Sequence, residues 1–135
     1  MPHFSSRSMD RLAECHPDLI ALMVEVVRTI DITVLEGHRG EARQRQMVAE
    51  GKSQLHWPNS RHNLSPSLAV DVAPYVAGVG VSWDWAHYHP LAAHVKATWG
   101  RLGKAGKLSG LYGLSWGGDW RTLKDGPHWQ LDPIR

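Results

Sequence analysis

The 135-residue sequence contains a single cysteine, Cys15, which excludes an intramolecular disulfide. A zinc site built on several thiolates is excluded as well, so any zinc would need histidine and carboxylate ligands. Long apolar runs are also missing, because no segment approaches the roughly 18 consecutive apolar residues of a membrane-spanning helix. The first ten residues carry no apolar signal-peptide core. We therefore expect synthesis in the cytoplasm and no membrane insertion.

The sequence also lacks an excess of one charge. It has 15 lysines and arginines against 13 acidic residues, a net charge of +2, and no block of like charge. This pattern argues against a nucleic-acid-binding arm, so we expect no nucleic-acid partner. A content of 42% hydrophobic and 21% charged residues is typical of a folded globular protein. At this length we expect a single domain over residues 1–135.

Histidine and tryptophan are abundant, with nine and seven copies. Histidine is the commonest metal ligand, and tryptophan stacks on flat or sugar-like ligands. Both residues also occur in cores and on surfaces, so their number alone does not identify a function. Their positions along the chain must show whether they belong to a binding site, the core or the surface.

Apolar residues at helical spacing predict two amphipathic helices. The first carries an apolar stripe from Leu19 to Ile30 and begins near Pro17, and the second carries a stripe from Leu91 to Leu102. Pro90 lies near the start of the second stripe, which is a favoured helix-start position. Shorter helices are expected over residues 6–15 and, as a polar surface helix, over residues 41–50.

Four short segments are predicted as strands: 32–35, 68–73, 111–116 and 128–131. In the second, Asp71 faces away from the apolar side, and Pro74 is expected to end the strand. In the last, His128 shares a face with Gln130. Helices precede scattered strands, so we predict the α+β class rather than a parallel βαβ array.

Three polar residues are placed to converge on a metal ion. His62 lies in the polar loop 52–67, Asp71 in the strand that follows it, and His128 at the start of the last strand. A catalytic zinc needs about three such ligands and one open position. Taken singly, each is more often a surface or hydrogen-bonded residue than a ligand.

Two further residues suit hydrolysis beside such a metal. Asp125, three residues before His128, is a candidate general base. Arg39 directly follows the first predicted strand and is a candidate to stabilise a developing oxyanion. Alone, Asp125 would be interpreted as a turn residue and Arg39 as a salt-bridge partner.

In combination, five ordered motifs resemble the zinc D,D-peptidase and L-alanyl-D-glutamate endopeptidase family. The family includes vancomycin-resistance dipeptidases and carboxypeptidases and many phage endolysins. The motifs are Gly37-His38-Arg39 with Gln44, Ser60-Arg61-His62, Ala69-Val70-Asp71, Gly118-Asp119-Trp120 and Asp125-Gly126-Pro127-His128-Trp129. The resemblance covers nearly the whole chain.

This resemblance implies a Hedgehog/D,D-peptidase-like fold, a small antiparallel sheet flanked by helices. It implies Zn²⁺ on His62, Asp71 and His128, with Asp125 as general base and Arg39 stabilising the polarised carbonyl. Ser60 would line the substrate cleft. Trp116 and Trp120, near the site in sequence, are further candidates for substrate contact, whereas the strand pattern favours the core for Trp129.

Two features depart from the family pattern. Eight residues separate His62 from Asp71, where six are more common, and the extra length falls in Leu64–Ser67. The base is Asp125, where the dipeptidases have glutamate. Other histidines provide alternatives: His56 could replace His62, and His87, His89 and His94 could form a rival site.

We therefore predict a phage endolysin that cleaves peptidoglycan, most simply at the L-alanyl-D-glutamate bond. It would be a monomer without a separate cell-wall-binding domain, and would reach the wall from the host cytoplasm through holin-made lesions. The alternatives are a D-alanyl-D-alanine carboxypeptidase, a non-catalytic zinc-containing wall-binding module, and, from the tryptophan content, a carbohydrate-binding module.

Overall fold

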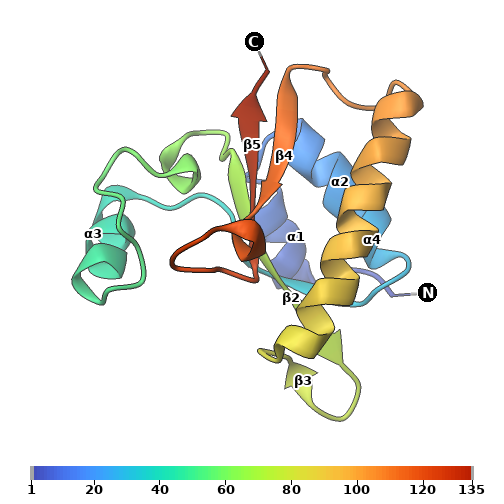
Figure 1. The fold of residues 1–135 in the computed structure, drawn as a ribbon, viewed down its shortest axis with the longest axis horizontal. Helices are drawn as coiled ribbons and strands as arrows, with labels where there is room; N and C mark the ends of the chain where they lie inside the picture. The colour runs from blue at the N-terminus through green and yellow to red at the C-terminus, as the bar shows by residue number, and fades with distance from the viewer. Residues whose placement is uncertain (1, 135) are drawn as a thin grey trace.

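The computed structural model describes residues 2–134 and has the predicted α+β architecture (Figure 1). Its sheet has the order β1-β2-β5-β4, with antiparallel pairing throughout, and β3 pairs with β2 as a hairpin. The helices are α1 (Ser6–Leu12), α2 (Pro17–Val27), α3 (Glu41–Ala49) and α4 (Trp85–Lys104), with short 3₁₀ helices η1 (Arg61–Asn63) and η2 (Gly117–Asp119). The strands are β1 (Ile32–Glu36), β2 (Ala69–Val76), β3 (Gly80–Val81), β4 (Tyr112–Trp116) and β5 (His128–Pro133).

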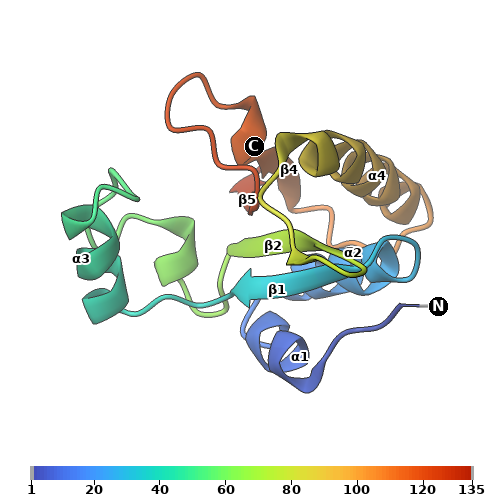
Figure 2. The same ribbon diagram turned by 90° about the horizontal axis from the view of Figure 1, so that it is seen from below.

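One hydrophobic cluster holds α1, α2 and α4 against the sheet. The predicted stripe of α2 is buried at Leu19, Leu22, Met23 and Val26, and α2 packs beside α4. Helix α4 contacts β2 and β4, while α1 packs on β1. Helix α3 lies apart from these helices (Figures 1 and 2). No helix within residues 2–134 is long and apolar enough to cross a membrane.

Strand β2 lies between β1 and β5 and carries Asp71 at the point where the three strands meet. Asp71 is the register partner of His128 on β5 and of Glu36 on β1. A register shift at Leu35 inserts one extra residue into β1, and this β-bulge places Glu36 rather than Leu35 opposite Asp71. Cross-strand pairing therefore brings three polar side chains to one point of the sheet.

Two sequence-based expectations are wrong. Pro74 does not end β2; it pairs with Ile32 inside the strand, and its carbonyl accepts a 2.9 Å hydrogen bond from Ser82 N. Proline lacks the backbone N–H donor but keeps its carbonyl acceptor, so the strand continues to Val76. Helix α4 does not start near Pro90; it begins at Trp85, with Pro90 inside the helix, because the Asp84 side chain caps α4 by accepting from Ala86 N at 2.9 Å.

Candidate metal centre and active site

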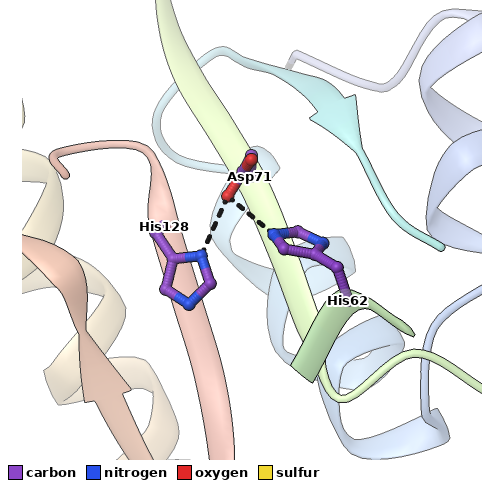
Figure 3. Close-up of side chains that lie close together, drawn as sticks. All are labelled: His62, Asp71 and His128. Atoms are coloured by element: carbon purple, nitrogen blue, oxygen red, sulfur yellow. Dashed lines mark hydrogen bonds and ion pairs between the residues drawn. The ribbon is translucent and has the colours of Figure 1, made fainter. Parts of the chain in front are cut away.

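Three side chains from separate elements converge at the middle of the sheet (Figure 3). His62 Nε2 from η1 and His128 Nδ1 from β5 each lie 3.2 Å from Asp71 Oδ1. The candidate ligand atoms of the three residues all lie within 4.8 Å of one another. No other group of three such side chains is found within residues 2–134. The convergence predicted for His62, Asp71 and His128 is therefore present.

The outer nitrogen of each imidazole is bound to an oxygen that only accepts. His62 Nδ1 lies 2.7 Å from the carbonyl oxygen of Gly37, and His128 Nε2 lies 2.9 Å from Gln130 Oε1. In the neutral imidazole each outer nitrogen therefore carries the proton, and the lone pair lies on the nitrogen facing Asp71; without a metal, a second proton on that nitrogen is what donates to the carboxylate. Two lone pairs and a carboxylate oxygen meet at one point, an arrangement that a cation stabilises and that suits a metal ion.

The electrostatics of Asp71 also favour a cation. Burial alone would raise the pKa of its carboxyl group, but the attraction of His62 and the hydrogen bond with His128 hold that pKa well below its usual range. Burial disfavours the charged form of His128, whereas its bond to Asp71 raises its pKa. The carboxylate is thus ionised and needs positive charge beside it, from imidazole protons or from a metal.

Local hydrogen bonds hold η1, which presents His62. The Ser60 side chain accepts from His62 N at 3.2 Å, and Asn63 Oδ1 accepts from Ser60 N at 3.0 Å, forming a capping box. The His62 carbonyl oxygen accepts from Arg39 N at 2.8 Å. The orientation of His62 is therefore determined from both sides of the turn.

The longer connection from His62 to Asp71 does not separate the two ligands. Leu64 projects to solvent, whereas Ser67 is fully buried. The Ser67 hydroxyl donates to Ala69 O at 2.7 Å, and Ser67 N donates to Glu14 O at 2.9 Å. The loop thus bulges outward and is anchored again before β2 begins.

Arg39 is 5% exposed and lies beside Asp71, with 3.7 Å between its Nη2 and Asp71 Oδ2. Its Nε and Nη2 donate to Glu36 Oε1 at 3.0 and 2.6 Å, and its Nη1 donates to Gln44 Oε1 at 3.0 Å. Gln44 is completely buried although it belongs to the polar helix α3, and it donates to Leu55 O at 2.6 Å. Arg39 is therefore held rigidly, and it fastens α3 to the site.

An open cavity of about 870 Å³ lies over these residues, within the usual range of ~300–1,000 Å³ for ligand sites. Its lining includes Met47 and Leu55 and the segment from Trp120 to Asp125. The lining includes Arg39, Ser60, His62, Asp71, Trp120, Asp125 and His128. We call this space the active-site cavity.

Asp125 borders the active-site cavity but does not belong to the metal-binding group. Burial, and to a lesser degree repulsion from Asp71, raises the pKa of its carboxyl group. A partly buried carboxyl group with a raised pKa suits proton transfer near neutral pH.

Trp116 is not on the cavity wall, so the expectation that it contacts substrate is not supported by its position. It is 5% exposed and stacks on Trp129, with 5.7 Å between ring centroids. Its indole nitrogen donates to Gly126 O at 2.7 Å, which holds the turn between Asp125 and His128. Trp129 is 1% exposed and lies in the core, as the strand pattern predicted.

Trp120 lines the active-site cavity, and its ring centroid lies 4.9 Å from that of His128.

The rival histidines form no metal group among residues 2–134. His87 bonds Ser82, with 2.6 Å between its Nδ1 and the hydroxyl oxygen, and His89 lies against Trp85 at 5.6 Å between ring centroids.

Sequence reasoning assigned no role to Gly37, Glu36 or Gln130, which orient the site. A signal existed for Gln130, because it shares a strand face with His128. Nothing in the sequence pattern marks Gly37 as the acceptor for His62, since the contact joins residues 25 positions apart through a backbone atom.

Two buried histidines and a partly buried aspartate that could hold a metal ion lie beneath an open cavity of an α+β domain, an arrangement found in metal-dependent hydrolases. The sequence model of the phage L-alanyl-D-glutamate peptidase family matches residues 1–131. The chain therefore belongs to this family, which confirms the resemblance stated from the motifs.

Individual relatives agree. The chain is 31% identical to the L-alanyl-D-glutamate peptidase of Escherichia phage T5 over 124 residues, covering 90% of this chain and 84% of that protein. It is 27% identical over 111 residues to the peptidoglycan L-alanyl-D-glutamate endopeptidase CwlK of Bacillus subtilis (strain 168), covering 77% of this chain and 62% of that protein.

A solved structure shares the fold. The crystal structure of the Serratia marcescens L-Ala D-Glu endopeptidase ChiX superimposes with a TM-score of 0.76 and 39% sequence identity. The match covers 97% of this chain and 91% of that one. The predicted fold class is thus confirmed by a related endopeptidase.

Proposed function

We propose that this chain is a zinc-dependent peptidoglycan peptidase that hydrolyses the L-alanyl-D-glutamate bond of the stem peptide. The observation that carries the proposal is the convergence of two imidazole lone pairs and the Asp71 carboxylate at the base of the active-site cavity. The family membership and the names of the three relatives support the substrate.

His62, Asp71 and His128 would hold the ion. Two neutral nitrogen ligands and one carboxylate are a donor set that suits Zn²⁺, and three protein ligands leave a position open. When bound, Zn²⁺ supplies Lewis acidity, which polarises a peptide carbonyl and lowers the pKa of a water molecule. Gly37 and Gln130 keep the two imidazoles in the tautomers that this role requires.

Asp125 acts as the general base. It takes a proton from the attacking water as the water oxygen bonds to the alanyl carbonyl carbon. It then passes that proton to the nitrogen of D-glutamate as the C–N bond breaks, which leaves a carboxylic acid on alanine and an amine on glutamate. The remaining proton of the acid then moves to the amine, so the products are a carboxylate and an ammonium group. The guanidinium of Arg39 lies on the same cavity and stabilises the negative charge that develops on the carbonyl oxygen.

Ser60 and Trp120 would contact the substrate, since both line the active-site cavity. The match to a phage T5 peptidase supports action as an endolysin. We propose that the protein acts as a monomer, is synthesised in the host cytoplasm and reaches the cell wall through holin-made lesions.

Mass spectrometry of muropeptides digested by the wild type, with and without chelator, tests the proposal. We expect fragments that end in L-alanine and fragments that begin with D-glutamate, and no such products from His128→Ala or after chelation. Release of free D-alanine alone would identify a D-alanyl-D-alanine carboxypeptidase instead. One bound zinc per chain with no cleavage of any muropeptide would identify a non-catalytic module.

A further inference from the structure

A second pocket of about 300 Å³ adjoins the active-site cavity, at the lower end of the ~300–1,000 Å³ range of small-molecule sites. Its lining is Trp83, Trp85, Tyr88, Lys124, Asp125, Gly126 and Pro127, and we call it the tryptophan pocket. Four of these residues, Trp83, Lys124, Asp125 and Pro127, also line the active-site cavity. The two spaces therefore adjoin at the proposed general base.

The two tryptophans of this pocket are unusually open to solvent. Trp83 is 66% exposed and Trp85 is 41% exposed. A tryptophan ring carries a large apolar area, and leaving it in water forgoes the free energy that burial would release. Neither ring is needed to fill the core, which makes a binding role the better explanation for their exposure.

The backbone that carries these rings is held firmly. Ser82, before Trp83, is 5% exposed, and its carbonyl oxygen accepts from the Tyr88 hydroxyl at 2.8 Å. Asp84, after Trp83, caps α4. The ring of Trp85 lies against those of Tyr88 and Trp116, at 6.0 and 6.2 Å between centroids. The Trp85 ring is thus held before binding, which lowers the entropy cost when a ligand stacks on it, whereas Trp83 is held through its backbone.

The wall of the pocket is also closely fitted. Gly126 lies against the ring of Tyr88, and a Cβ at this position would lie 3.1 Å from that ring. The aromatic faces and the backbone of Gly126, which has no side chain, form a surface suited to a flat ligand with an apolar face. A pyranose ring has such a face in its axial C–H groups and polar groups around its edge.

We propose that the tryptophan pocket is a saccharide subsite that binds the N-acetylmuramyl sugar carrying the stem peptide. This inference rests on the proposed function. In peptidoglycan, the amino group of L-alanine is joined to the lactyl group of that sugar. The sugar thus lies about 7 Å from the scissile carbonyl, at ~3.5 Å for each extended unit. A subsite that begins at Asp125 suits a sugar attached this close to the bond that is cut.

Binding to glycan strands stripped of stem peptides tests the subsite independently of cleavage. We expect wild type to bind them in a pull-down and a calorimetric titration, and Trp83→Ala to bind about tenfold more weakly, equal to ~1.4 kcal/mol. Trp83→Tyr should retain most of the affinity because it keeps an aromatic face. Leu111→Ala is the matched control, because Leu111 is 63% exposed and lines neither pocket.

Kinetics supply the second readout. The quantity measured is kcat/KM for a muramyl peptide divided by kcat/KM for the same peptide without sugar. We expect this ratio to fall about tenfold in Trp83→Ala and to stay at the wild-type value in Leu111→Ala. An unchanged ratio together with unchanged glycan binding would overturn the subsite. A dimer that Trp83→Ala abolishes, without glycan binding, would overturn it too and assign the surface to a second copy. If wild type cleaves no peptide, the proposed function is wrong, but the glycan-binding assay still shows whether the tryptophan pocket binds a saccharide.

Discussion

The carbonyl oxygen of Gly37 and the Nδ1 atom of His62 lie 2.7 Å apart, and this backbone acceptor determines which imidazole nitrogen faces Asp71. Gly37 occupies a tight position, because a Cβ there would clash with the carbonyl oxygen of Arg11 and lie 3.2 Å from Cys15 Sγ. The packing of the N-terminal segment against the end of β1 thus orients a candidate metal ligand.

Replacing Gly37 should therefore weaken metal binding. Gly37→Ala pushes the backbone away from Arg11 and displaces the acceptor of His62, so we expect zinc affinity to fall about 10–100-fold, as for other partners of metal-binding histidines. Competition with a chromophoric chelator measures this. Gly40→Ala is the matched control, since nothing lies within 4 Å of a Cβ at Gly40. Equal zinc affinities for the two variants would contradict the assignment.

Zinc should stabilise the folded protein. A ligand that binds only the native state at 1,000 times its Kd adds about 4 kcal/mol, or roughly 8–16 °C in Tm at ~2–4 °C per kcal/mol. Differential scanning fluorimetry with a chelator, zinc or calcium checks this. Calcium should have little effect because it prefers six or more oxygen ligands. A zinc-induced shift that persists in His128→Ala would show that the ion binds elsewhere.

Asp125→Asn should abolish most of the activity and leave the metal bound. Loss of a general base lowers kcat by about 10²–10⁴-fold, while zinc content should remain at the wild-type level because Asp125 is not in the ligand group. Hydrolysis of a muramyl peptide, together with metal analysis of the purified variant, measures both. Activity within a few fold of wild type would remove Asp125 from the mechanism.

The same substitution should raise stability at neutral pH in the metal-free protein. Burial and then Asp71 raise the pKa of the Asp125 carboxyl group, so its stabilising contribution is present below the unfolded-state pKa and is lost as pH rises through the folded-state pKa. Asparagine is neutral at every pH and avoids that loss. The gain in Tm over wild type should therefore be present at pH 7 and disappear in acid. A gain that does not depend on pH would have another cause.

Arg39→Lys should lower kcat by about 10²-fold, because removing one stabiliser of the oxyanion typically costs that much. Lysine keeps the positive charge but lacks the planar guanidinium group, whose separate N–H groups donate to Glu36 and Gln44 at the same time. Steady-state kinetics should show the loss mainly in kcat. Arg45→Lys, at a side chain that is 69% exposed on α3, is the control and should behave as wild type. A loss confined to KM would assign Arg39 to substrate binding.

Cys15 should resist alkylation while the protein is folded. Burial, with smaller contributions from Glu14 and Asp71, raises the pKa of its thiol to about 12. At pH 8 the native thiol is therefore protonated and enclosed, and iodoacetamide should modify it only after denaturation. Intact-protein mass spectrometry follows the adduct. Modification of the native protein at the rate of a free thiol would contradict the burial of Cys15.

Much of the fold follows from local patterns. The apolar stripes of α2 and α4, the β-branched run of β1 and the alternation around Asp71 predicted these elements and the α+β class. The errors lie where neighbouring elements override a local signal. Pro74 remains in β2 because β1 and Ser82 still bond that stretch, and α4 begins before Pro90 because Asp84 caps it.

For the candidate site, the amino-acid pattern identifies the three proposed donor residues and their order along the chain, because motif spacing indicates which residues share a turn or a strand. The folded structure was needed to show that Gly37 and Gln130 orient the two imidazoles, that a bulge in β1 places Glu36 opposite Asp71, and that Trp116 lies in the core. These relations depend on strand register and on backbone atoms brought together from distant segments. Local sequence patterns do not reveal such contacts, since they form only when β1 and β5 pair with β2 on either side of Asp71.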